Sequence, residues 1–234
     1  YPFVKTGGLG DVCAALPQAL LNSGVDVRLI MPAYPQLNQV VSNKQWLQTL
    51  HPPFATAEAQ LYFAYLPSGG GIYLLDVPHF YARLGSTYLA PNGADWWDNY
   101  LRFGLFSWAI TQLEDFDWQP DVLHTHDWLT GLAPYWLLQQ PEPRPKSLHT
   151  IHNLSFQGKL NAAQCAELGL PSNTASFMQM ALEYTDVIAT VSPRYAEEIQ
   201  TPAFGCDLDR LLEIRQDALH GILNGVDYQV WSPD

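Results

Sequence analysis

Basic residues are scarce in this sequence. Lysine and arginine together number 11 against 23 aspartates and glutamates, so the formal net charge of the 234 residues is -12. A surface of that sign repels phosphate backbones and anionic headgroups, which argues against broad contact with nucleic acid or with an anionic membrane surface. If the protein binds an anionic small molecule, a few well-placed groups must hold it.

Long apolar runs and paired cysteines are also missing. No apolar run approaches the ~20 residues that span a bilayer, and no basic segment leads into an apolar one at the start, so we predict neither a membrane protein nor a secreted one. Cys13, Cys165 and Cys206 are odd in number and widely spaced, which argues against disulfides and structural zinc. We interpret all three as small core residues of a cytoplasmic protein.

Two familiar hydrolytic motifs are absent as well. Ser155 and Ser192 do not lie in a Gly-x-Ser-x-Gly sequence, so a hydrolase triad has no support. No close-spaced pair of acidic residues identifies a glycosidase, although carboxylates that pair in space do not show in a sequence. The chemistry must therefore be sought in other patterns.

The first such pattern is a glycine-rich turn. Gly7, Gly8 and Gly10 directly precede residues 12–22, whose apolar positions recur every three or four residues as in a helix buried on one side. Backbone N–H groups and the positive end of a helix dipole at such a turn form a seat for a phosphate, and Lys5 would add a mobile cation. The turn matches neither of the two standard phosphate-binding glycine motifs, so ordinary turn chemistry stays open as an alternative.

Strand patterns alternate with helix patterns along the rest of the chain, and 47% hydrophobic content is ample for a core. We predict strands at 25–31, 60–66, 71–77, 122–126, 147–152, 186–191 and 220–223, with 60–66 and 71–77 forming a hairpin across residues 67–70. We predict helices at 12–22, from about 100 to 116, and at 129–139, 174–184, 193–199 and 207–216. Ser192 would be the N-cap of the helix at 193–199, with Pro193 at its first position. Residues 33–53 read as loop with one short helical or extended piece at most. The alternation predicts an α/β fold, a Rossmann-like, doubly wound and mostly parallel sheet.

In a sheet of this kind ligands bind at the carboxyl ends of the strands. Three polar clusters fall there: the glycine turn, His126-Asp127-Trp128, and His152-Asn153. The glycine turn should hang from a first strand that would lie before Tyr1, so we expect the chain to be a fragment. We expect the three clusters to converge.

Each cluster also has a simpler interpretation. His124 and His126 alternate along one strand, which places both imidazoles on one face beside a carboxylate, as in a metal site. No further ligand set recurs at metal spacing, so we predict no metal, and one of these histidines would then be an ordinary core residue. Asp127 is also a residue type that caps helices, so it could instead be the N-cap of the next one. His152 and Asn153 can simply end a strand.

Several motifs together resemble those of bacterial glycogen synthases and plant starch synthases. They are Lys5-Thr-Gly-Gly-Leu, Gly71-Ile-Tyr-Leu-Leu-Asp-Val-Pro-His, His126-Asp127-Trp128, His152-Asn153 with Gln157-Gly158, Thr190-Val-Ser-Pro-Arg-Tyr-Ala-Glu-Glu-Ile, and Leu223-Asn224-Gly-Val-Asp227 with Trp231-Ser-Pro. They cover nearly the whole chain in the family's order, which makes the resemblance specific.

The resemblance implies residues 1–223 as the N-terminal, Rossmann-like domain of a two-domain GT-B glycosyltransferase. Residues 224–234 would begin the interdomain linker, with the C-terminal domain absent. The complete enzyme would transfer glucose from ADP-glucose to the nonreducing 4-OH of an α-1,4-glucan, glycogen or starch, with retention. It would need no cofactor and no metal, and would work in the cytoplasm, or in the plastid stroma of a plant. The fragment alone would be inactive.

The resemblance also assigns roles to individual residues. Asp127 and His152 match catalytic positions, and the residues that match donor and sugar contacts are Lys5, Gly7, Gly8, Tyr88, Asn153 and Asn224. Leu129 departs from the family, since bacterial members commonly carry histidine there. That departure keeps open a noncatalytic glucan-binding module derived from a synthase. A different GT-B activity, such as sucrose synthesis or phosphorolysis, is a further alternative that the Lys5-Thr-Gly-Gly opening disfavours.

Overall fold

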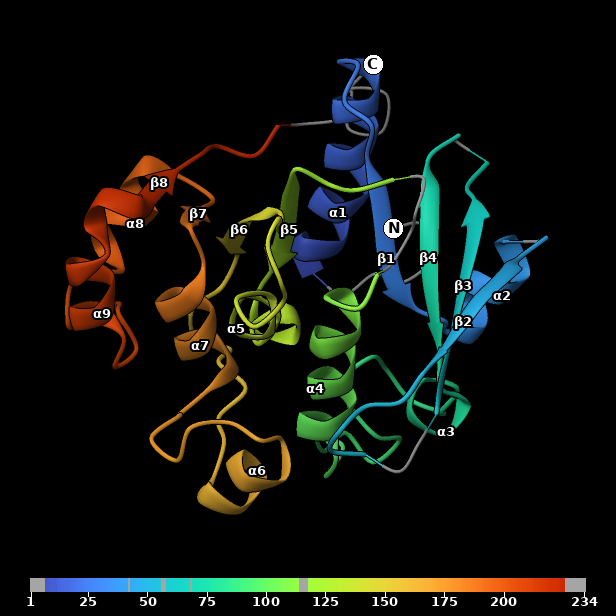
Figure 1. The fold of residues 1–234 in the computed structure, drawn as a ribbon. Coiled ribbons are helices and arrows are strands. Elements are labelled where there is room, and N and C mark those ends of the chain that lie inside the picture. The colour runs from blue at the N-terminus through green and yellow to red at the C-terminus, as the bar shows by residue number, and fades with distance from the viewer. Residues whose placement is uncertain (1–6, 42, 56–57, 68, 114–117, 226–234) are drawn as a thin grey trace. The chain divides into compact units, whose positions relative to one another are not determined.

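A computed structural model describes residues 7–41, 43–55, 58–67, 69–113 and 118–225. The chain divides into two compact units, the first formed by residues up to Arg102 together with those from Gly225 onward, the second by Phe103–Asn224. The chain passes from one unit to the other within α4 (Asn99–Ile110) (Figure 1). None of the described helices is long and apolar enough to cross a bilayer.

The first unit is built on a mixed sheet with strand order β1-β4-β3-β2, whose strands lie side by side in Figure 1. β1 runs parallel to β4, while β3 is antiparallel to both β4 and β2. The elements of this unit are α1 (Gly7–Asn22), β1 (Arg28–Pro32), α2 (Pro35–Val40), β2 (Gln45–Leu50), β3 (Ala59–Tyr65), β4 (Gly71–Asp76) and α3 (Pro78–Tyr81). The β3–β4 pair confirms the predicted hairpin.

Two predictions for this unit were wrong in detail. Helix α1 begins at Gly7 instead of Val12, so the glycines form its first turn, where backbone N–H groups lack intrahelical partners. Residues 33–53 contain both α2 and β2, although a single short piece was expected. Strand β2 lies at a sheet edge with Trp46 exposed, so it lacks the alternating apolar face that marks a half-buried strand.

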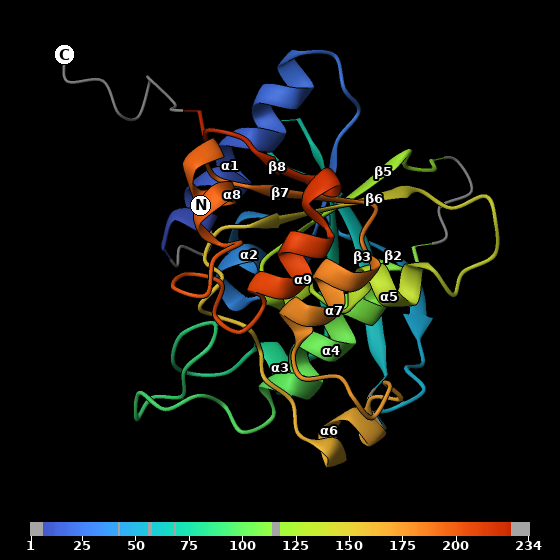
Figure 2. The same ribbon diagram turned by 90° about the vertical axis from the view of Figure 1, so that its left-hand side faces the viewer.

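The second unit carries a wholly parallel sheet with strand order β5-β6-β7-β8. Figure 2 shows α5, α7 and α9 gathered on one side of these strands. Its strands are β5 (Val122–His126), β6 (Lys146–Ile151), β7 (Val187–Thr190) and β8 (Leu219–Gly221). Its helices are η1 (Trp128–Thr130), α5 (Ala133–Leu137), α6 (Ala162–Glu167), α7 (Phe177–Tyr184), α8 (Pro193–Glu198), α9 (Asp209–Ile214) and η2 (Gln216–Ala218). The parallel sheet confirms the α/β prediction.

Local chemistry explains where these helices begin and end. Ser192 caps α8 by accepting from the backbone N–H of Tyr195 at 3.0 Å, with Pro193 in the first turn, as predicted. The predicted helix 129–139 is instead η1 followed by the short α5, because Pro134 lacks an N–H and fits only a first helical turn. Helix α4 ends at Ile110, short of the predicted 116, and Phe116 lies outside the described residues.

The core of the second unit joins the sheet to the helices that follow it. Its buried members are Ile151, Leu154, Met178, Leu182, Ile188, Ala196, Ile199, Leu208, Leu212 and Leu219. Trp128, two residues after the end of β5, packs against this cluster and lies edge-on to Phe177 at 5.7 Å between ring centroids. Gly158 has φ +61, and a Cβ there would lie 2.4 Å from the Trp128 ring, so only glycine fits. The loop after β6 therefore packs directly on Trp128 in the segment after β5.

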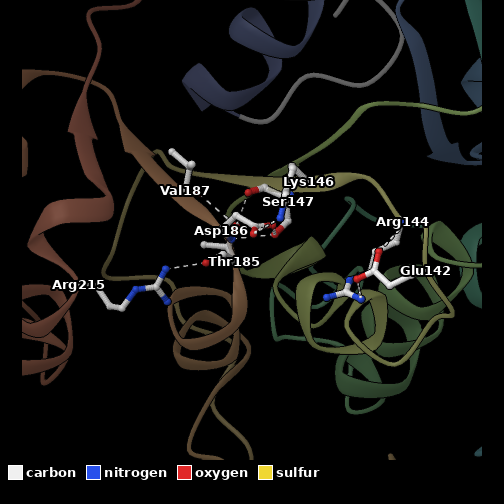
Figure 3. Close-up of polar contacts among 8 residues, drawn as sticks. All are labelled: Glu142, Arg144, Lys146, Ser147, Thr185, Asp186, Val187 and Arg215. Carbon is white, nitrogen blue, oxygen red and sulfur yellow. Dashed lines mark hydrogen bonds and ion pairs between the residues drawn. The ribbon is translucent and has the colours of Figure 1, made fainter.

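A polar network fixes the amino ends of β6 and β7, shown in Figure 3. The carboxylate of Asp186 accepts from the backbone N–H of Ser147 at 2.8 Å and from its hydroxyl at 2.9 Å. Arg215 donates to the carbonyls of Leu182, Glu183 and Thr185 at 2.7, 2.8 and 2.6 Å. These carbonyls belong to the carboxyl end of α7, where acceptors lack intrahelical donors. The network therefore ties together the amino ends of β6 and β7, at the end of the sheet opposite to Asp127 and His152.

Candidate active site

The register of β5 against β6 decides which side chains meet. His126 lies opposite Thr150 and Thr125 lies opposite His149, so alternate residues share a face. On one face His124 Nε2 is 2.7 Å from Thr150 Oγ1, and His126 Nδ1 is 3.1 Å from His152 Nε2. On the other face Thr125 Oγ1 is 2.9 Å from His149 Nδ1.

His124 and His126 therefore do lie on one face, as the sequence indicated. Their ring centroids are 4.1 Å apart. His124 is bonded to a threonine hydroxyl, which fits the core interpretation of one of the two. Among the described residues, no group of three or more histidines, cysteines or carboxylates is arranged to hold a metal ion.

Asp127 links the two strand ends. It follows β5 with φ 50 and ψ -175, and its backbone N–H donates to the carbonyl of Thr150 at 3.0 Å. Its carboxylate accepts from the backbone N–H groups of His152 at 2.8 Å and Asn153 at 3.3 Å. It makes no side-chain capping bond to the turn after it, so the capping interpretation was wrong. The predicted meeting of Asp127 with His152 is confirmed.

Burial controls the protonation of this cluster. It raises the pKa of Asp127 to about 6, against the opposing effect of the two backbone N–H bonds. Burial also lowers the pKa of His152 to about 4, and burial together with neighbouring histidines lowers that of His124 to about 4 and that of His149 to about 3. For the same reasons the pKa of His126 lies well below its usual value. Near neutral pH the site thus holds neutral imidazoles beside a carboxylate that is mostly ionised.

The remaining predicted site residues divide between the two units. Asn153 is exposed, and its side-chain oxygen accepts from the Ser155 backbone at 3.0 Å, while Asn224 is exposed near the end of the described residues. Gly7, Gly8 and Tyr88 belong to the first unit, and Lys5 lies outside the described residues. Two of the three predicted clusters therefore meet in the second unit. The approach of the glycine turn to them stays a prediction.

Sequence reasoning missed the support beneath Tyr88. Arg102 is 1% exposed and donates to the carbonyls of Phe80 at 2.9 Å and Thr87 at 3.1 Å. Asn99, bonded to Arg102 at 2.6 Å, donates to the carbonyl of Tyr88 at 3.0 Å. An arginine between Leu101 and Phe103 in an apolar helix pattern is the one signal that pointed to a buried guanidinium.

Sequence reasoning also missed His149, which is fully buried and whose Nε2 has no hydrogen-bond partner among the described residues. The pairing of His126 with His152 was not foreseen either. Both follow from strand register, which the sequence does not display.

A parallel sheet with polar clusters at the carboxyl ends of neighbouring strands defines a Rossmann-like ligand-binding domain. Residues 1–214 match the family model described as the starch synthase catalytic domain. The glycogen synthase of Paramagnetospirillum magneticum is 45% identical over 251 residues, covering 100% of this chain and 51% of that protein. The glycogen synthase of Burkholderia thailandensis is 40% identical, covering 100% and 47%. The chain therefore belongs to the glycogen and starch synthase family.

A solved structure agrees with this assignment. The catalytic domain of starch synthase IV from Arabidopsis thaliana, bound to ADP and acarbose, superimposes with a TM-score of 0.85 at 27% identity, covering 99% of this chain and 51% of that one. The fold is that of the Rossmann-like N-terminal domain of a GT-B glycosyltransferase. The chain spans about half the length of the curated relatives it matches.

Proposed function

We propose that the protein is a glucosyltransferase that moves glucose from ADP-glucose to the nonreducing 4-OH of an α-1,4-glucan with retention of configuration. Residues 1–223 form its N-terminal domain, and residues 224–234 begin the linker to a C-terminal domain. The observation that carries the proposal is the hydrogen bond that the Asp127 carboxylate accepts from the backbone N–H of His152, at the carboxyl ends of β5 and β6. It lies in a chain of this family, at the edge of the sheet where such folds bind ligands.

The geometry suits the charge changes of this reaction. Departure of ADP leaves positive charge on the glucose ring and negative charge on the phosphate, so the site needs acceptors near the sugar and donors near the phosphate. The Asp127 carboxylate fixes the main chain of His152, and the lowered pKa keeps the His152 ring neutral, so no imidazolium repels the developing positive charge. In this proposal the glycine turn and Lys5 supply the donors near the phosphate.

Substrates and setting follow from the same proposal. The Arabidopsis relative was solved with ADP and acarbose, which supports a nucleotide sugar as donor and a glucan as acceptor here. Tyr88, Asn153 and Asn224 contribute donor or sugar contacts. Glycogen or starch is the polymer, the cytoplasm or a plastid stroma is the compartment, and the net charge of -12 disfavours nucleic acid as a partner.

One observation favours a second candidate, a noncatalytic glucan-binding module. Leu129 stands where bacterial members commonly carry histidine, and its backbone carbonyl accepts from Ser107 at 3.2 Å, which fixes an apolar residue beside the site. Such a module would bind glucan without transferring glucose.

Glucose transfer by the full-length protein distinguishes the two. Radiolabelled ADP-glucose is incubated with glycogen, with UDP-glucose as the competing donor, and the product is digested with an enzyme specific for α-1,4 linkages. We expect incorporation that depends on ADP-glucose and is released by the digestion, and none from the 234-residue chain alone. Binding of maltooligosaccharide without any transfer by the full-length protein would establish the second candidate instead.

A further inference from the structure

The His126–His152 pair has a property that neither ring has alone. His126 Nδ1 and His152 Nε2 are 3.1 Å apart, and a hydrogen bond between two neutral imidazoles holds one proton between its two nitrogens. If His126 donates, both rings carry their proton on Nδ1. If His152 donates, both carry it on Nε2. The tautomers of the two rings are therefore coupled.

His126 is the more firmly held of the two residues. Its backbone N–H donates to Thr130 Oγ1 at 2.8 Å, and the Thr130 hydroxyl lies 2.8 Å from the His126 carbonyl. Its ring packs against that of His124, and its strand pairs with β6 opposite Thr150. A ring held in this way gives a fixed direction to any bond that it makes.

His152 lies just beyond β6, which ends at Ile151. Its backbone is fixed by Asp127, but among the described residues the polar partner recorded for its ring is His126 alone. Burial keeps the pKa of His126 well below its usual value, and the nearby His124, His152 and His149 lower it further. The bond therefore keeps its single proton near neutral pH.

We propose that His126 is a positioning residue for glucosyl transfer, orienting the His152 ring and selecting which of its nitrogens carries the proton. The catalytic part of this inference rests on the proposed function. The coupling of tautomers rests on the hydrogen bond itself. Neither the positioning of His152 nor the coupling of tautomers requires a charge on either imidazole ring.

Nuclear magnetic resonance tests the coupling directly. In full-length protein labelled with ¹⁵N-histidine, long-range ¹H–¹⁵N spectra distinguish Nδ1–H from Nε2–H rings, and single substitutions assign the signals. We expect the same tautomer for His126 and His152, and a mixture of tautomers for His152 in His126→Phe. Unlike tautomers in the wild type, or an unchanged His152 signal in His126→Phe, would overturn the proposal.

Kinetics test the positioning. Asparagine places an amide group about where Nδ1 lies and either donates or accepts, so His126→Asn should retain most of kcat. His126→Phe should lower kcat about three- to tenfold, as expected for one lost neutral hydrogen bond, with the acceptor KM unchanged. His220→Phe, which removes an exposed histidine of β8 outside this cluster, should leave kcat within about twofold. Equal losses in His126→Asn and His126→Phe would contradict positioning through this bond.

The outcomes separate this inference from the proposed function. A full-length protein without transferase activity but with coupled tautomers defeats the proposed function and leaves the coupling intact. An active protein with independent tautomers defeats only the inference. If His126→Phe fails to fold, the wild-type spectrum and His126→Asn still decide the matter.

Discussion

The carboxylate of Asp127 accepts a 2.8 Å hydrogen bond from the backbone N–H of His152, joining the carboxyl ends of two parallel strands. The two residues are far apart in sequence and meet only because β5 and β6 pair in one register. At this position the backbone of Asp127 has a positive φ of 50, a conformation that non-glycine residues rarely adopt. Strain of this kind is typical of functional sites.

Asp127→Asn tests the ionisation of this carboxylate. Burial raises its pKa from 3.8 to about 6, so its contribution to stability is full below about pH 3.8 and is lost as the pH rises through about 6. The neutral asparagine has no such dependence. We therefore expect the Tm of the wild type minus that of Asp127→Asn to fall between pH 3.8 and pH 7, measured by calorimetry. A difference that rises over this range would contradict the buried-carboxylate account.

His149 should behave in the opposite sense. Its pKa falls from 6.5 to about 3 because the ring is buried, with a smaller effect from the nearby His124 and His152. Its contribution to stability is present above about pH 6.5 and is lost as the pH falls toward 3, at about 1.4 kcal/mol per pH unit.

The measurement is urea unfolding of the wild type and His149→Phe at pH 7.5 and 4.5. The wild type should lose more stability than the variant on acidification, since phenylalanine does not titrate. Parallel losses in both proteins would show that His149 is not held neutral by the fold.

Arg215 should contribute to stability without contributing to catalysis. Its guanidinium donates to three carbonyls at the end of α7, and Figure 3 shows the bond to that of Thr185. Arg215→Met should lower the free energy of unfolding by about 1.5 to 3 kcal/mol, the scale of hydrogen bonds from a charged donor. Arg215→Lys is the matched control, because lysine keeps the positive charge but lacks the planar guanidinium that donates to several carbonyls at once. A kcat that falls in the folded Arg215→Met protein would contradict a purely structural role.

Lys5 is predicted to hold donor phosphate charge. Lys5→Gln in the full-length enzyme should raise the activation free energy for ADP-glucose by about 1 to 3 kcal/mol in kcat/KM. Lys146→Gln is the control, since that lysine is exposed at the amino end of β6, 3.5 Å from Asp186. Unchanged kinetics in Lys5→Gln would remove Lys5 from the site.

The sequence predicted elements with strong local signals and missed those that depend on tertiary pairing. β5 and the Ser192 cap of α8 were predicted because a β-branched run and a cap residue before proline are local. Helix α6 was not predicted, although the spacing of Asn161 and Gln164 in the sequence is typical of the capping box that they form. Edge strand β2 gains its order from pairing with β3, which no local pattern of β2 reveals.

The site divides in the same way. Alternation along one strand placed His124 and His126 on one face, and the topology of parallel sheets brought Asp127 toward His152. The partners of individual atoms depend on register, because a shift of one residue would exchange the faces of β5. The His126–His152 bond and the burial of His149 therefore required the structure.

The most direct measurement of the central claim is the steady-state kinetics of His152→Ala in the full-length protein, with ADP-glucose and glycogen varied separately. The account predicts a loss in kcat on the order of 100-fold or more with the fold intact, as for a lost preorganised contact to the transition state. A variant that keeps kcat and changes only the KM for the acceptor would contradict it.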